Sequence, residues 1–278
     1  MKIIFDNLSA TCSKVTTQLY STSFSLGIYF LKREFHEPIY GIYGFVRLAD
    51  EIVDSFHGFD KEFLIQKMRN DTVEAITQKI SINPILNSFQ AVVHRYHIGW
   101  DLIDTFLLSM EMDLRKTEHN SDSYNQYILG SAEVVGLMCL RVFTEGNNDL
   151  YQELKPYAMK LGAAFQKVNF LRDLKADYQE LGRTYFPGVN FNHFSAHDKE
   201  EIQKEIESDF SNALMGIKKL PTSSRRGVYL AYFYYHKLFL RIKATPPEKV
   251  MDARIRIPDS NKIGLMLQSL LRHQFDLL

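Results

Sequence analysis

Apolar residues recur along this chain at helical spacing, and no stretch alternates apolar with polar residues as a half-buried strand would. No internal repeat beyond one doubled acidic motif, and no shift in composition, marks a second domain. The expected fold is therefore all-α, a single-domain helical bundle over residues 1–278 with a central cavity. The expected helices span about 10–31, 38–56, 60–80, 84–97, 99–115, 122–144, 149–180, 197–219, 223–243 and 260–275.

Two of these helices carry aspartates four residues apart. Asp50 and Asp54 lie in RLADEIVD, and Asp173 and Asp177 lie in NFLRDLKAD. Residues four apart share one face of a helix, so each pair presents two carboxylates to one point. Mg²⁺ takes oxygen ligands and is usually held by one or two carboxylates together with substrate phosphates. Two facing pairs would therefore hold Mg²⁺, or Mn²⁺, where a diphosphate could bind.

A polar stripe extends each acid pair along an otherwise apolar helix. Such a stripe on one helix is more often the solvated side of a surface helix than the wall of a cavity. Two helices with the same acid spacing, each with an arginine near its acids, reverse that preference. The stripes are Tyr43, Arg47, Asp50 and Asp54 on the first helix, and Gln166, Asn169, Asp173 and Asp177, with Arg172 beside them, on the second.

Composition agrees with a single helical protein of considerable core. The 278 residues are 45% hydrophobic, and 33 basic residues balance 33 acidic ones, which argues against a nucleic-acid partner. Cys12 and Cys139 are the two cysteines, which suits a reducing compartment. Asp6 interrupts the N-terminus where a signal peptide would be apolar, and no run approaches about 18 apolar residues. A cytoplasmic location is expected.

The two acidic segments resemble the aspartate motifs of the squalene/phytoene synthase family. The matching segments are RLADEIVD and the run GAAFQKVNFLRDLKADYQELGRTYFP over 162–187. STSFSLGIYFL (21–31) is similar to the family's serine-rich opening, and EVVGLMCLRVF (133–143) to its mid-chain helix. Bacterial phytoene synthases are the members it resembles most. The resemblance implies an isoprenoid-synthase-type bundle and head-to-head condensation of two prenyl diphosphates through a cyclopropylcarbinyl diphosphate.

The resemblance also implies roles for individual residues. The four aspartates become metal ligands, and Tyr43, Arg47 and Tyr127 join them as catalytic residues. The basic stretch that contains Arg254 and Lys262 is either ordinary surface or a phosphate-binding element. The implied substrate-binding residues are Ser21, Ser23, Phe24, Gln166, Asn169, Arg172, Arg183, Tyr185 and Lys262.

Three positions depart from the family pattern. Glu51 stands where a second consecutive aspartate is usual, which preserves the charge. Ala176 stands where many members carry a glutamate before the last aspartate, which removes a carboxylate. Glu133 replaces a common glycine, and a buried glutamate would need a partner. Arg141, two turns further on, is the candidate that the sequence offers.

The preferred activity is that of a 15-cis-phytoene synthase. Two twenty-carbon geranylgeranyl diphosphates would condense to phytoene through prephytoene diphosphate, an early step of carotenoid biosynthesis. Squalene or dehydrosqualene from two fifteen-carbon farnesyl diphosphates is the first alternative. A non-catalytic helical assembly subunit is the second. NADPH is not expected, and the lipid product could draw the protein to the inner face of a membrane as a peripheral protein.

Substrate length has one further hint. Gly27 and Ile28 lie one to two turns beyond Ser21 and Ser23, and neither is a bulky aromatic. Each isoprene unit extends roughly 5 Å, about one helical turn. The hypothesis is that Ile28 leaves room for twenty-carbon tails. Chain length, double-bond geometry and oligomeric state stay open from the sequence.

Overall fold

The computed structural model describes residues 1–115, 118–180, 182–250 and 254–255. Within these ranges the chain contains no β-strand, only an isolated bridge between Glu118 and Thr184, so the predicted all-α class is confirmed. The predicted helix 260–275 and Lys262 lie outside the described residues. The elements are α1 (Lys2–Tyr20), α2 (Thr22–Tyr29), η1 (Arg33–Phe35), α3 (His36–Asp54), α4 (Lys61–Gln78), α5 (Pro84–Tyr96), α6 (Trp100–Arg115), α7 (Ser121–Ile128), η2 (Leu129–Glu133), α8 (Val134–Phe143), α9 (Asn148–Lys175), η3 (Ala176–Glu180), η4 (Phe191–His193), α10 (Ala196–Lys219), α11 (Thr222–Ala244) and α12 (Pro247–Val250).

Capping residues set several helix starts. Asp60, Asn83, Asn147 and Ser195 each accept a hydrogen bond from a backbone N–H in the first turn of the helix that follows. A side-chain oxygen at this position satisfies a donor that has no partner within the helix. The predicted starts near 60, 84, 149 and 197 therefore agree with the structure to within one residue.

The prediction of one helix over 10–31 is wrong. The helical segment begins at Lys2 and stops at Ser21, whose backbone is extended (φ −149°, ψ 101°). The Ser21 hydroxyl accepts a hydrogen bond from the Phe24 N–H at 3.2 Å and thereby caps α2. Serine is among the preferred N-cap residues. The helical spacing of apolar residues on both sides of Ser21 concealed the break.

The predicted helices 122–144 and 149–180 are continuous but not uniformly α-helical. Each contains one π-helical turn, η2 in the first and η3 at the end of the second. The first turn carries Ala132 against α9, where a Cβ on Gly162 would approach the Ala132 carbonyl oxygen to 2.6 Å. Glycine at 162 therefore lets α9 lie close to this turn.

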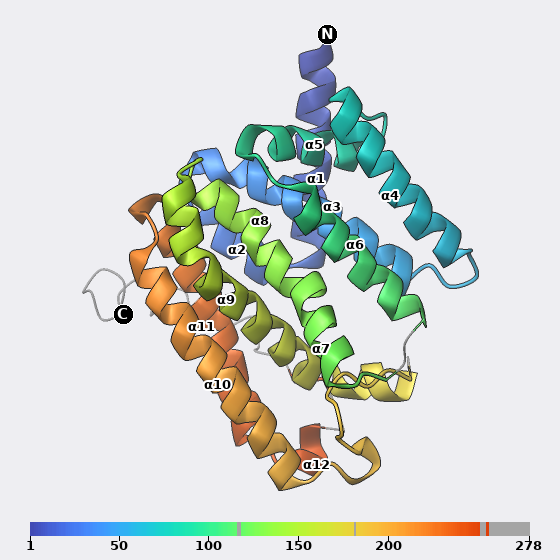
Figure 1. Cartoon of the computed structure of the whole chain (residues 1–278), viewed down its shortest axis with the longest axis vertical. Coiled ribbons are helices and arrows are strands. Elements are labelled where there is room, and N and C mark those ends of the chain that lie inside the picture. The colour runs from blue at the N-terminus through green and yellow to red at the C-terminus, as the bar shows by residue number, and fades with distance from the viewer. Residues whose placement is uncertain (116–117, 181, 251–253, 256–278) are drawn as a thin grey trace.

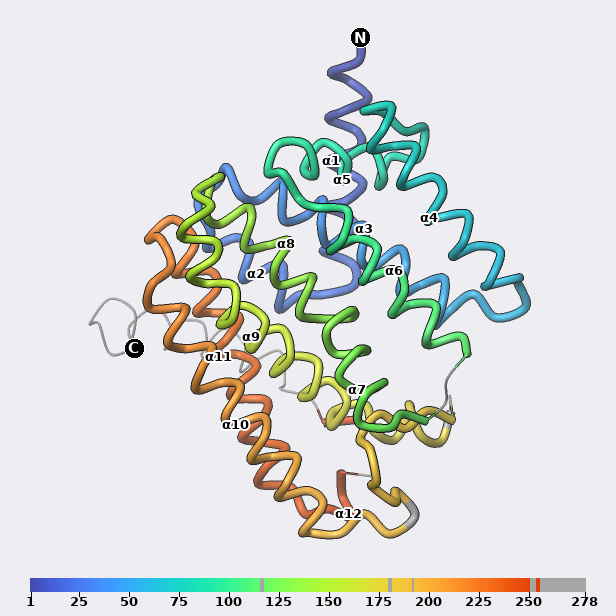
Figure 2. Tube along the Cα trace, in the orientation of Figure 1, coloured from blue at the N-terminus to red at the C-terminus, as the bar shows by residue number. Residues whose placement is uncertain are grey.

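The helices form two groups that meet along α3, α8 and α9. Figure 1 shows α9 between α8 and α10, with α11 beside α10. The other group places α3 against α1, α5 and α6, and its core stacks Phe45 on Phe89 with ring centroids 4.0 Å apart. The trace in Figure 2 places the N-terminus and α12 at opposite ends of the molecule. The short α2 packs on α11, where a Cβ on Gly227 would lie 2.6 Å from the Gly27 carbonyl oxygen.

One helical run, Ser121–Phe143, is long and apolar enough to cross a membrane by length and composition. The expectation from the sequence was that no segment would be long and apolar enough to cross a membrane, and by length and composition this segment is. Half of the apolar window is buried inside the protein, and the core helix of a soluble protein meets the same criteria.

Glu133 is the last residue of the π turn η2. The prediction that Arg141 would be its partner is wrong. Burial raises the pKa of the Glu133 carboxyl, and the positive charges that oppose this effect belong to Lys160 and Lys167 of α9. Arg141 instead places its guanidinium 3.5 Å from the centroid of the Tyr151 ring.

Candidate active site

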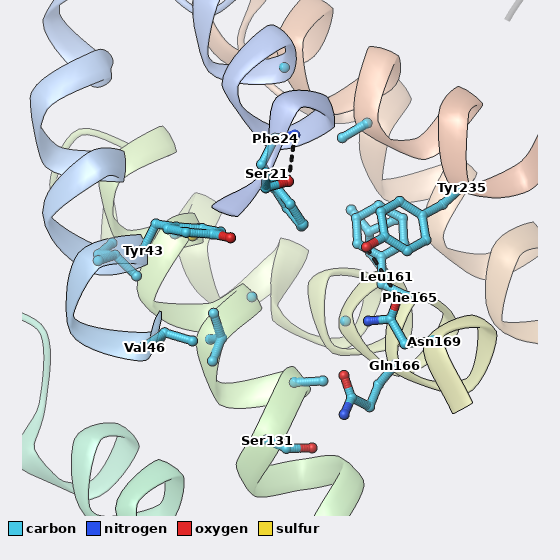
Figure 3. A pocket seen from close by; sticks show the side chains of 18 of the residues that line it. Ser21, Phe24, Tyr43, Val46, Ser131, Leu161, Phe165, Gln166, Asn169 and Tyr235 are labelled. Carbon is cyan, nitrogen blue, oxygen red and sulfur yellow. Dashed lines mark hydrogen bonds between the residues drawn. The ribbon is translucent and has the colours of Figure 1, made fainter. Parts of the chain in front are cut away.

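A cavity of about 620 Å³ lies between the two groups of helices. Its walls come from α1, α2, α3, α6, α8, α9, α10 and α11 and from the π turns η2 and η3, so segments far apart in the sequence surround one volume. Figure 3 shows Tyr43 on one side of this space and Phe165 and Tyr235 on the other, with Gln166 and Asn169 pointing inward. The volume is within the usual range for a site that binds small ligands.

Both predicted polar stripes face this cavity. Tyr43, Arg47, Asp50 and Asp54 of α3 all line it, while Phe45 on the opposite face of α3 is fully buried. On the other side the lining residues are Gln166, Asn169, Arg172, Asp173 and Asp177. The interpretation of the stripes as cavity wall is confirmed.

Arginines pair with acids at one end of the cavity. Arg183 Nη1 donates to Asp54 Oδ1 at 2.9 Å, and Arg254 Nε lies 2.7 Å from Asp173 Oδ1. Arg172 Nε donates to the same Asp173 oxygen at 3.0 Å, and Arg47 pairs with Glu51. The polar end of the cavity therefore holds acids and guanidinium groups together, an arrangement suited to an anion and a cation at once.

Two of the acids are difficult to ionise in this setting. Burial, followed by the charge of Asp54, raises the pKa of Asp50 to about 7. Burial, followed by the charge of Asp173, raises the pKa of Asp177 to about 7. Burial disfavours the charged form of each carboxyl, and repulsion by the neighbouring carboxylate adds to this effect. A bound divalent cation would relieve this repulsion.

The donor chemistry of the site fits Mg²⁺. All four aspartates offer oxygen ligands, which hard cations prefer. The two members of each pair lie about one helical turn apart, and all four line the cavity. Among the described residues, no three acidic, histidine or cysteine side chains converge on one point. A metal held by two carboxylates would thus take its remaining ligands from water and substrate oxygens, as Mg²⁺ commonly does.

Aromatic rings form the wall next to the polar end. The Phe24 ring centroid lies 5.7 Å from that of Tyr43 and 6.0 Å from that of Tyr235. Tyr235 stacks on Phe165 at 4.0 Å, and its hydroxyl donates to Asn169 Oδ1 at 3.3 Å. Ring faces attract cations, so this wall can stabilise positive charge on a bound molecule.

Some predicted site residues are not part of the cavity wall. Ser23 and Tyr127 are absent from the lining, and Lys262 is outside the described residues. Tyr127 is buried, and its hydroxyl donates to Asp113 Oδ2 at 2.6 Å. Ser21, Phe24, Arg183 and Tyr185 do line the cavity.

Sequence reasoning missed Asp113 of α6, which also lines the cavity. Burial raises its pKa to about 7, with Arg183 acting in the opposite direction. Asp113 has no acid four residues away, so the spacing that revealed the other aspartates does not apply. The available signal was its place on the buried face of α6, three residues beyond Met110 and seven beyond Phe106.

The profile of the squalene/phytoene synthase family matches residues 17–260. The chain belongs to the squalene/phytoene synthase family. This member is 29% identical over 199 residues to the 4,4'-diapophytoene synthase of Staphylococcus haemolyticus, covering 68% of this chain and 66% of that protein. It is 28% identical over 186 residues to the phytoene synthase of Arthrospira platensis, covering 63% and 60%. It thus spans about three fifths to two thirds of these relatives.

Solved structures of family proteins share the fold. This protein superposes on a crystal structure of a dehydrosqualene synthase with a TM-score of 0.83. The two sequences are 19% identical, and the match covers 97% of this chain and 98% of the other. The TM-score with a squalene synthase from Alicyclobacillus acidocaldarius is 0.75 at 17% identity, with 86% and 95% covered. The predicted isoprenoid-synthase-type bundle is therefore confirmed.

Proposed function

We propose that this protein condenses two geranylgeranyl diphosphates head to head, giving phytoene through prephytoene diphosphate, as an early step of carotenoid biosynthesis. The carrying observation is a single cavity that joins two acid pairs and their arginines at one end to a long apolar wall. The polar end suits diphosphates with Mg²⁺, and the apolar wall suits prenyl tails.

The residues of the polar end have the chemistry that ionisation of an allylic diphosphate requires. Arg47, Arg172 and Arg183 line the cavity, and guanidinium groups bind phosphate oxygens through paired hydrogen bonds. Bound Mg²⁺ would supply further neutralisation of the diphosphate charge. Phe24 and Tyr235 would face the resulting carbocation, and the apolar wall would keep out water that could quench it.

The length of α9 supports the twenty-carbon substrate. Cavity-lining residues run along this helix from Leu154 to Asp173. At 1.5 Å per residue, the stretch from Tyr157 to Asp173 covers roughly 24 Å. Four isoprene units of roughly 5 Å each extend about 20 Å, which this wall can accommodate.

Two specific observations favour an alternative substrate. The relative from Staphylococcus haemolyticus is a 4,4'-diapophytoene synthase, and the structure with a TM-score of 0.83 is a dehydrosqualene synthase. The second candidate function is therefore dehydrosqualene formation from two farnesyl diphosphates. Four aspartates around one cavity argue against a non-catalytic assembly subunit, which would have no use for buried acids that cost stability.

Product analysis tests the proposal. Purified protein is incubated with Mg²⁺ and either geranylgeranyl or farnesyl diphosphate, and the extracted lipids are separated by chromatography. We expect phytoene from the twenty-carbon substrate. A hydrocarbon formed efficiently only from farnesyl diphosphate would select the second candidate, and no product from either would contradict both.

A substitution in α2 should change the preferred chain length. Ile28 is buried and lines the cavity. Ile28→Phe adds volume at this wall, so we expect kcat/KM for geranylgeranyl diphosphate to fall by about tenfold relative to that for farnesyl diphosphate, the low end of the effect of one methylene group in an apolar pocket. Leu26→Phe is the matched control, because Leu26 lies on the same helix but outside the lining. An unchanged ratio in Ile28→Phe would contradict this account of the pocket.

Product formation should not require NADPH. A head-to-head condensation that ends by proton loss balances without a reductant, whereas squalene formation consumes hydride. We expect equal product yields with and without NADPH, measured by chromatography of parallel reactions. A yield that rises from zero only when NADPH is added would show squalene synthesis instead.

A further inference from the structure

We propose that Asp113 is a positioning residue that fixes the segment following the second aspartate motif, and with it Arg183, at the polar end of the cavity. This inference rests on the proposed function and deepens it. Asp113 comes from α6, a helix that carries neither aspartate motif. Its side chain nevertheless lines the same cavity as both motifs.

Both oxygens of the Asp113 carboxyl accept hydrogen bonds from tyrosines of other elements. The Tyr127 hydroxyl of α7 donates to Oδ2 at 2.6 Å, and the Tyr185 hydroxyl donates to Oδ1 at 3.4 Å. Asp113 is only 9% exposed, and Tyr127 and Tyr185 are also buried. The bond from Tyr127 is short and the one from Tyr185 is long, and loss of either would leave buried polar groups without that partner.

The Tyr185 ring is fixed on several sides. It stacks on Phe170 with centroids 4.0 Å apart and planes 4° from parallel. The rings of Tyr127 and His119 lie at 5.2 Å and 5.6 Å from it. With the ring held in this way the hydroxyl reaches Asp113, so the carboxyl and these rings together form a socket for Tyr185.

The position of Tyr185 in this socket limits where the guanidinium of Arg183 can lie. Arg183 lies two residues before Tyr185, and its backbone N–H donates to the Asp177 carbonyl oxygen at 2.7 Å. Its guanidinium binds Asp54 of the first motif at 2.9 Å. Although burial opposes the charge, the Asp113 and Asp54 carboxyls raise the pKa of Arg183 above its usual value. Arg183 therefore links the two aspartate motifs. Asp113 stabilises the positive charge of Arg183 and, through Tyr185, positions the backbone near Arg183.

Asp113→Asn preserves the size of the side chain and removes its charge and one acceptor oxygen. Arg183 and Tyr185 should then lose their fixed position relative to the acids. Removal of a group that supports ligand-binding residues typically costs about 10- to 100-fold. We expect kcat to fall within that range, and the affinity for inorganic diphosphate with Mg²⁺, measured by calorimetry, to fall about tenfold with a rise in KM in the same direction.

Tyr127→Phe and its matched control separate positioning from general stability. Tyr127→Phe removes the hydroxyl that binds Asp113, and should lower kcat in the same direction. Tyr124→Phe is the control, because Tyr124 lies on the same helix, is equally buried, and has a hydroxyl without a partner in the described part of the chain. It should retain wild-type kcat and diphosphate affinity. The double variant Asp113→Asn, Tyr127→Phe should lose little more than Asp113→Asn alone, since both changes break one contact.

The outcomes distinguish this inference from the proposed function. Wild-type kcat and diphosphate affinity in Asp113→Asn would overturn the positioning role. Equal losses in Tyr124→Phe and Tyr127→Phe would also overturn it, since the effect would then be one of general packing. If the wild type forms no product but binds diphosphate more tightly than Asp113→Asn, the positioning role stands and the proposed reaction falls. Absence of both activity and diphosphate binding in the wild type would overturn both.

Discussion

Asp50→Ala or Asp173→Ala should reduce kcat/KM for the prenyl diphosphate by about 1000-fold or more while leaving the helical circular dichroism unchanged. Each substitution removes one of two carboxylates that would share a divalent cation, and preorganised charge is usually the largest contribution to catalysis of this kind. Folding should survive because Asp50 and Asp173 lie at a cavity wall, with side chains 33% and 21% exposed.

Asp71→Ala is the matched control for this pair. Asp71 lies on α4, where it pairs with Lys67 across one exposed turn. The control variant should keep wild-type activity, since surface ion pairs contribute little. Full activity in Asp50→Ala, in Asp173→Ala, or in wild type with excess chelator would refute the assignment of the acids.

Asp50→Asn should make the ligand-free protein more stable at pH 8. The folded pKa of Asp50, about 7, lies above the ordinary 3.8, so the folded state holds its proton more tightly than the unfolded state. The free energy of unfolding therefore falls as pH rises from about 4 to about 7. A shift of this size corresponds to about 4 kcal/mol, but the one-third exposure of Asp50 reduces the expected penalty to about 1–2 kcal/mol.

Thermal unfolding measures this effect. Asn cannot ionise, so at pH 8 Asp50→Asn should raise the midpoint by about 3–5 °C, and at pH 5 the difference should fall to less than half of that. Addition of Mg²⁺ with inorganic diphosphate should reverse the order, because ligand binding stabilises the wild type more. An Asp50→Asn variant that is less stable than wild type at pH 8 without ligands would contradict this account.

Local patterns were sufficient for most of the fold and for the two acid stripes. Helical spacing placed Asp50 beside Asp54 on α3, and the repeated design on α9 indicated that the stripes face each other. The start of α5 at Pro84 is also a local matter, since Asn83 caps it through the backbone of the residues that follow directly. Each of these inferences needs only neighbours within about one helical turn.

The remaining features depend on contacts that sequence spacing does not encode. Asp113 acquires its role from Tyr127 and Tyr185, 14 and 72 residues away. Arg183 meets Asp54 across 129 residues, and Arg254 meets Asp173 across 81. Tyr127, predicted at the reacting carbons, lies behind Asp113 because packing against Tyr185 and Phe170 buries its ring.

The long helix α9 carries the wall along which a prenyl tail would lie and, with the π turn η3 that continues it, the second acid pair. An inserted or deleted residue between Gly162 and Asp173 would rotate the acids by about 100° relative to that wall. The helix therefore cannot be lengthened or shortened there without turning the metal ligands away from the substrate. Substitutions that alter the size of cavity-lining side chains such as Ile28 and Tyr157 can change the length of the product, whereas insertions or deletions in this part of α9 cannot.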